Sequence, residues 1–132
     1  MSGRSLEALS DLLRARDGIE AAWVFGSVAA GEATPDSDVD VAVLGPAPLG
    51  SDEKRTLIER LAQLLGRPVD LIDLQTTRGP IVGRILQEGT RLFCEDPSLY
   101  AGVLIRWWGD QADWMPYRRR IQKTRRNQWI GS

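Results

Sequence analysis

The stretch Asp38-Val39-Asp40-Val41-Ala42-Val43-Leu44 decides the fold class, because carboxylates alternate with valines along it. Successive side chains of a β-strand point to opposite faces of a sheet, so this alternation predicts a strand. The valines would lie on one face, and Asp38 and Asp40 on the other. A short apolar run over residues 19–25 ends at Gly26-Ser27 and predicts a second, largely buried strand.

Helical and extended patterns alternate on both sides of these strands. Leucines at helical spacing predict two helices, and turn-forming residues separate the elements. The expected elements are a helix over 5–17 capped by Ser5 and stopped by Gly18, a helix capped by Ser51 and stopped by Gly66, a strand over 68–74, a helix from Pro80 to Gly89, a strand over 90–94 and a helical segment from Pro97 through Trp114. This order predicts an α/β or α+β fold, with helices packed against a mixed sheet.

The length of 132 residues predicts one domain over 1–132, with its core at about 5–95 and a C-terminal aromatic and basic helical extension over 97–132. Histidine is absent and Cys94 is the single cysteine. This composition excludes His-based triads, an internal disulfide, Cys/His zinc sites and iron-sulfur clusters. The chemistry must therefore use carboxylates, hydroxyls, Arg and Lys, or a hard cation. No segment has the length of a membrane span and no leader pattern is present, so we expect a cytoplasmic protein without membrane contact.

The charge is distributed unevenly along the chain. Residues 1–113 have a net charge of −7, whereas the last 19 residues carry +6 and no acid. A basic tail on an acidic body could bind nucleic acid or an acidic protein partner, and the sequence leaves both open. We expect Trp107, Trp108 and Trp114 to be core residues or interface anchors, since aromatic residues dominate both.

Carboxylates gather where the two central strands are expected. Asp38 and Asp40 would lie about 6.6 Å apart along their strand, and a neighbouring strand would lie about 4.8 Å away. Asp70 would add a third carboxylate if its strand is that neighbour. Asp73 is the alternative, but alternation places it on the opposite face. Such a cluster is unfavourable without a cation, and oxygen ligands favour Mg²⁺ or Mn²⁺. Two such ions about 4 Å apart can clamp both oxygens of a nucleotidyl transfer.

Gly26 and Ser27 fit a phosphate site beside these carboxylates. Glycine lets backbone N–H groups approach an anion, and a helix beginning there would add its positive end and the Ser27 hydroxyl. A triphosphate is the ligand that this arrangement favours. Simpler alternatives are a glycine that only ends the strand, a serine that only caps a helix, and an Asp-x-Asp pair that is only a solvated strand edge.

Gly26-Ser27, Ser37-Asp38-Val39-Asp40 and Val69-Asp70-Leu71 together resemble the DNA polymerase β nucleotidyltransferase superfamily, in particular its minimal nucleotidyltransferases. The resemblance spans roughly residues 20–95. It implies that Asp38 and Asp40 bind two Mg²⁺ ions, that Asp70 binds the catalytic metal and helps to activate the acceptor hydroxyl, and that Gly26 and Ser27 hold the nucleotide phosphates. It also implies an antitoxin that transfers AMP from ATP to a tyrosine of a HEPN toxin.

One position departs from the family pattern Gly-Ser-x-Ala-Arg-Gly, because Ala30 stands where the arginine is common. Two other functions therefore stay open. One is a non-catalytic antitoxin that neutralises its partner by direct contact. The other is nucleotidyl transfer to RNA or to a small hydroxylated molecule. A protein acceptor is favoured over that last possibility, since little of the chain is left to shape another acceptor site.

Overall fold

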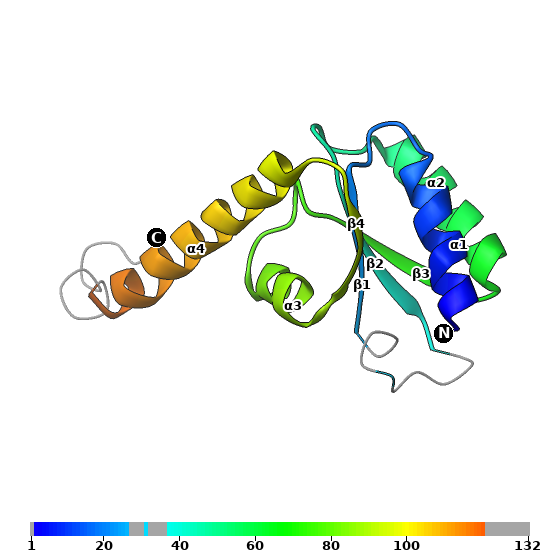
Figure 1. The fold of residues 1–132 in the computed structure, drawn as a ribbon. Helices are drawn as coiled ribbons and strands as arrows, with labels where there is room; N and C mark the ends of the chain where they lie inside the picture. Colours follow the sequence, from blue (N-terminus) through cyan, green and yellow to red (C-terminus); the bar gives the residue numbers. More distant parts are fainter. Residues whose placement is uncertain (1, 27–30, 32–36, 121–132) are drawn as a thin grey trace.

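Four strands form a mixed sheet in the order β3-β2-β1-β4, with helices on both faces (Figure 1). The computed structural model describes residues 2–26, 31 and 37–120, with side chains as far as residue 111. The elements are α1 (Gly3–Arg14), β1 (Ala21–Phe25), β2 (Val39–Leu44), α2 (Ser51–Leu65), β3 (Val69–Asp73), α3 (Pro80–Glu88), β4 (Thr90–Cys94) and α4 (Pro97–Arg120). Strand β1 is antiparallel to β2 and β4, whereas β2 is parallel to β3. The predicted mixed sheet flanked by helices is confirmed.

The sheet separates two apolar layers. On one face, Val39, Val41 and Val43 of β2 pack against leucines of α1 and α2. On the other face, Ala42 and Leu44 pack with residues of α3 and α4. Figure 1 shows α1 and α2 on one side of the sheet, and α3 and α4 on the other. The predicted alternation in β2 is therefore correct, and Asp40 lies on the face that α3 and α4 cover.

The helix starts differ from the sequence prediction. Helix α1 begins at Gly3, because the Ser2 hydroxyl accepts a hydrogen bond from the Ser5 backbone N–H at 3.1 Å. The predicted cap, Ser5, instead lies inside the first turn. Gly50 likewise precedes α2 in place of the predicted Ser51, and its N–H donates to the Glu53 carboxylate at 3.1 Å. Ser5 and Ser51 are therefore both helical. Ser2 satisfies a free N–H group at the start of α1, and the Glu53 side chain satisfies one at the start of α2.

The helix ends agree with the sequence prediction at α2 and differ from it at α1 and α4. Gly66 ends α2 in the left-handed conformation, as predicted. Helix α1, however, ends at Arg14 and not near Gly18, and a short turn joins it to β1. Helix α4 continues beyond Trp114 to Arg120. In the described part of the chain, no helix combines the length and the apolar character needed to cross a membrane.

Helix α4 is fastened to the loop that follows β3. The Arg106 guanidinium donates to the carbonyl oxygens of Leu74 at 2.5 Å and Thr77 at 3.3 Å. The Arg78 guanidinium donates two hydrogen bonds, of 2.8 and 2.5 Å, to the Asp110 carboxylate. These contacts hold α4 against the loop after β3 at Arg106 and Asp110.

The tryptophans of α4 differ in their surroundings. Trp107 is buried, and its ring lies so close to Gly83 that a Cβ there would stand 2.7 Å from a ring carbon. Trp108 is 60% exposed and Ile105 is 68% exposed. Trp107 is thus a core residue, whereas Trp108 is not. The side chain of Trp114 and the basic run from Arg118 to Arg126 lie outside the side chains that the structure describes.

Candidate active site

Three strand ends lie side by side at one end of the sheet. Because β1 is antiparallel to β2 and β2 is parallel to β3, the end of β1 lies beside the starts of β2 and β3. Asp40 is opposite Phe25 of β1 and opposite Asp70 of β3. Side chains in register on adjacent strands point to the same face, and the strands lie about 4.8 Å apart. The sheet therefore brings Asp40 and Asp70 together, with Asp38 immediately before β2.

The charges of the neighbouring aspartates act on Asp40. Asp38 and Asp70 are exposed, whereas Asp40 is partly buried. The pKa of Asp40 is raised above its ordinary value, first by burial and then by the negative charges of Asp70 and Asp38. Among the described residues, Arg84 of α3 is the cation that opposes this rise. Asp40 is thus an acidic group that a positive charge would stabilise.

Gly26 supports the Asp40 carboxylate directly. Its φ of +75° is in the left-handed region, which side chains other than glycine adopt at a cost. A Cβ at Gly26 would overlap Oδ2 of Asp40 and lie 3.2 Å from its Cγ. The glycine is therefore required twice, for the turn and for the carboxylate that lies over it. Ser27, the other predicted phosphate-binding residue, lies outside the described residues.

The structure distinguishes Asp70 from Asp73, the other candidate for the third carboxylate of the site. Asp73 is 5% exposed, and its carboxylate accepts hydrogen bonds from the N–H groups of Leu49 at 2.8 Å and Gln75 at 2.9 Å. Those contacts fasten the loop before α2 to the end of β3. Asp73 therefore has a structural task on the other face, and Asp70 is the acid that lies beside Asp40.

The donor set at this edge suits a hard divalent cation. All the acidic groups here offer carboxylate oxygens, and the mutual repulsion at Asp40 is what a cation would relieve. Within residues 2–26, 31 and 37–111, no three acidic or cysteine side chains already stand close enough to enclose an ion. The exposed Asp38 and Asp70 would have to turn toward Asp40 when an ion binds.

Sequence reasoning missed Arg84. It comes from a helix far along the chain, and no spacing relates it to the aspartates; only the tertiary fold brings its charge to Asp40.

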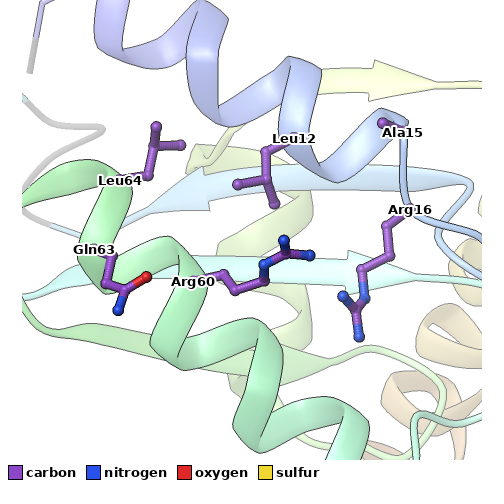
Figure 2. Close-up of a pocket in the computed structure, with 6 residues that line it drawn as sticks. All are labelled: Leu12, Ala15, Arg16, Arg60, Gln63 and Leu64. Carbon is purple, nitrogen blue, oxygen red and sulfur yellow. The ribbon is translucent and has the colours of Figure 1, made fainter.

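A separate groove between α1 and α2 is lined by Leu12, Ala15, Arg16, Arg60, Gln63 and Leu64 (Figure 2). These helices cover the face opposite Asp40, so the groove is not part of this site.

Comparison with known proteins agrees with this geometry. The sequence profile of the family described as polymerase beta nucleotidyltransferase matches residues 7–98. Protein adenylyltransferase MntA of Shewanella oneidensis is 31% identical over 81 residues, which are 60% of this chain and 58% of MntA. The chain thus matches little more than half the length of that relative.

Two solved structures share the fold. A toxin-antitoxin structure with AMP-PNP has a TM-score of 0.74 at 21% identity, covering 90% of this chain and 95% of the other. A structure of a tri-AMPylated Shewanella oneidensis HEPN toxin in complex with an MNT antitoxin has a TM-score of 0.73 at 21% identity, covering 93% of this chain and 97% of the other. The profile match extends over more than half of the chain, from α1 through β4, and includes all the aspartates of the site. The chain belongs to the polymerase β nucleotidyltransferase family.

Proposed function

We propose that this protein is a metal-dependent nucleotidyltransferase that transfers AMP from ATP to a tyrosine hydroxyl of a HEPN-type toxin, and so acts as an antitoxin. One observation carries the proposal: the strand register sets Asp40 beside Asp70, with Asp38 adjacent and Gly26 beneath the Asp40 carboxylate. Carboxylates offer ligands to the metal of a metal-nucleotide complex, and a glycine turn lets backbone N–H groups approach its phosphates.

The relatives support the choice of substrate and acceptor. MntA is named a protein adenylyltransferase. Of the solved structures with this fold, one holds AMP-PNP and another contains an AMPylated HEPN toxin. We carry these activities to the present chain as a proposal. Because the reaction uses ATP, we place it in the cytoplasm.

Asp38, Asp40 and Asp70 would hold two Mg²⁺ ions, or Mn²⁺ in their place. Such ions neutralise triphosphate charge and make a bound hydroxyl more acidic. The backbone N–H groups at Gly26 and Ser27 would orient the phosphates. The acceptor oxygen forms a bond to the α-phosphorus, the bond from that phosphorus to pyrophosphate breaks, and the hydroxyl proton passes to Asp70. Asp70 suits this task because it is exposed and on the same face as Asp40.

One observation favours a second function. Ile105 and Trp108 are large apolar side chains, more than half exposed, one turn apart on α4. Exposed aromatic and aliphatic groups of this kind are typical anchors of a protein interface. A non-catalytic antitoxin would need this surface and not the carboxylates. Transfer to RNA would depend on the basic run, which lies outside the described side chains.

The test is transfer of label from ATP carrying a radioactive α-phosphate to a purified HEPN-type partner. We expect labelling by the wild type with Mg²⁺, and loss of at least a hundredfold in Asp38→Asn and Asp40→Asn, because each removes a proposed metal ligand. Asp52→Asn, an exposed aspartate on α2, is the matched control and should label normally. Equal labelling by all four proteins would refute the site, and no labelling by the wild type would favour the non-catalytic antitoxin.

A further inference from the structure

We infer that Arg84 binds the β- and γ-phosphates of the nucleotide and stabilises the departing pyrophosphate. The inference rests on the proposed function and assigns to one residue of α3 a role that the carboxylates cannot fill. Aspartates bind cations, and a triphosphate with about four negative charges needs positive partners beyond the ions themselves. The strand edge carries Asp38, Asp40 and Asp70, so a cation must come from a neighbouring element.

Helix α3 is positioned to supply this cation. The helix ends at Glu88, and a Cβ on the next residue, Gly89, would lie 3.2 Å from the carbonyl oxygen of Val24. Thr90 is paired with Val24 in the sheet. Because Val24 is two residues before Gly26, the last turn of α3 lies against the end of β1, beside the candidate phosphate site.

Arg84 lies on the exposed side of α3, one turn before its end. Val82 and Ile85 of α3 are buried in the same apolar cluster as Phe25, the residue of β1 opposite Asp40. Arg84 is one turn before Glu88 and on the same side of the helix, as their ion pair shows. Its charge lowers the pKa of Asp40, which opposes the effect of the neighbouring aspartates. Because α3 packs over the face of the sheet that carries Asp40, its exposed Arg84 is positioned to act at the same site.

The Arg84 side chain is available to a ligand. It is 70% exposed and forms an ion pair with Glu88, with 3.7 Å between Nε and Oε2. An exposed helical pair of this length holds its arginine weakly. A guanidinium can donate two parallel hydrogen bonds to phosphate oxygens, which lysine cannot do. A bound triphosphate would therefore displace Glu88.

The same contact would assist the reaction. As the acceptor oxygen bonds to the α-phosphorus, the electrons of the breaking bond move to the bridging oxygen of pyrophosphate. A cation already aimed at that leaving group stabilises the charge as it develops. Loss of Arg84 should therefore weaken ATP binding and slow transfer, while leaving the affinity for the acceptor protein unchanged.

Arg55 offers a closely matched control. It is 71% exposed on α2 and also has a helical partner at 3.7 Å, Asp52, but it lies on the helix pair that covers the opposite face. Arg84→Lys keeps the charge without the forked geometry, and Glu88→Gln releases Arg84 from its competitor. None of these exposed positions contributes to the core, so thermal melting should be unchanged in each variant.

The experiment is calorimetric titration of ATP and of AMP, each with Mg²⁺, into the wild type and these variants. We expect Arg84→Ala to bind ATP about tenfold more weakly, with unchanged AMP affinity, because AMP lacks the phosphates that Arg84 contacts. Arg84→Lys should be intermediate, Glu88→Gln equal to wild type or tighter, and Arg55→Ala equal to wild type. Unchanged ATP affinity in Arg84→Ala, or an equal loss for ATP and AMP, would overturn the inference alone. A wild type that binds no ATP would overturn the proposed function as well.

Discussion

Asp40 lies on a partly buried surface between two other carboxylates, so its charge costs the folded protein free energy. Its pKa is raised by burial first and by Asp70 and Asp38 next. A raised pKa in the folded state means that stability falls as the pH rises through that pKa. We therefore expect Asp40→Asn to increase the free energy of unfolding at pH 7 in EDTA, and to change it little below the ordinary aspartate pKa of 3.8.

Urea denaturation of the wild type and Asp40→Asn at both pH values measures this difference. Asp17→Asn, at an exposed position in the turn after α1, controls for the loss of a charge elsewhere. A destabilised Asp40→Asn at pH 7 would show that attractive contacts hold this carboxylate, and the account of a repulsive cluster would be wrong.

Gly26 allows a second prediction at this scale. Gly26→Ala adds both a strained φ and an overlap with the Asp40 carboxylate. Gly66→Ala adds a strained φ of +69° but meets no atom within 4 Å. We expect Gly66→Ala to lose about 1 kcal/mol of unfolding free energy, and Gly26→Ala to lose more and to abolish nucleotide transfer. Chemical denaturation gives both values, and equal losses would mean that Asp40 moves aside freely.

The residues of the site were predictable to different degrees. Period-2 alternation was enough to put Asp38 and Asp40 on one face, and to separate Asp70 from Asp73. The structural role of the buried Asp73 could not be predicted, because the N–H groups that donate hydrogen bonds to its carboxylate, those of Leu49 and Gln75, belong to loops. Arg84 could not be predicted either, since the packing of α3 on the sheet decides its position.

At the scale of elements, the strands were easier to predict than the helix ends. The predicted strand over 90–94 coincides with β4, and the others agree with the structure within two residues at each end. The caps of α1 and α2 were wrong by one to three residues, because several polar residues near a helix start can satisfy the same N–H groups. The anchoring of α4 depends on Arg78 and Arg106, whose partners are distant in the sequence.

The ion pair between Arg78 and Asp110 makes the docking of α4 dependent on pH. The pKa of Asp110 is lowered, chiefly by the hydrogen bond from Arg78. A lowered pKa gives stability that is present above the ordinary value of 3.8 and is lost as the pH falls through the folded pKa. We expect Asp110→Asn to melt at a lower temperature than wild type at pH 7, and the difference to disappear at about pH 2.

Calorimetric melting curves across this pH range measure the effect. Asp52→Asn is the control, because its partner Arg55 is 3.7 Å away and both side chains are exposed, so its removal should change little. A difference between Asp110→Asn and wild type that persisted at the lowest pH would assign the effect to packing and not to charge.

At the scale of the whole molecule, α3 and α4 lie on the side of the sheet opposite α1 and α2 (Figure 1), and α4 carries the exposed apolar residues Ile105 and Trp108. We expect Ile105→Asp with Trp108→Asp to weaken the complex with a HEPN-type partner by at least tenfold, because buried apolar anchors dominate interface energies. ATP binding should be unchanged. Calorimetric titration of the partner checks this, with Leu64→Asp on α2 as the control for an exposed apolar residue elsewhere. Equal affinity in both variants would place the interface on another surface.

Intact-mass spectrometry of a HEPN-type partner, after incubation with this protein, ATP and Mg²⁺, tests the central claim most directly. The account predicts that the partner gains the mass of one or more AMP groups on tyrosine. It also predicts that the gain disappears with Asp70→Asn although this variant still binds ATP, because Asp38, Asp40 and Gly26 are intact. A partner that stays unmodified but is inhibited in a stable complex would contradict the account, and would show that this protein neutralises its partner by contact.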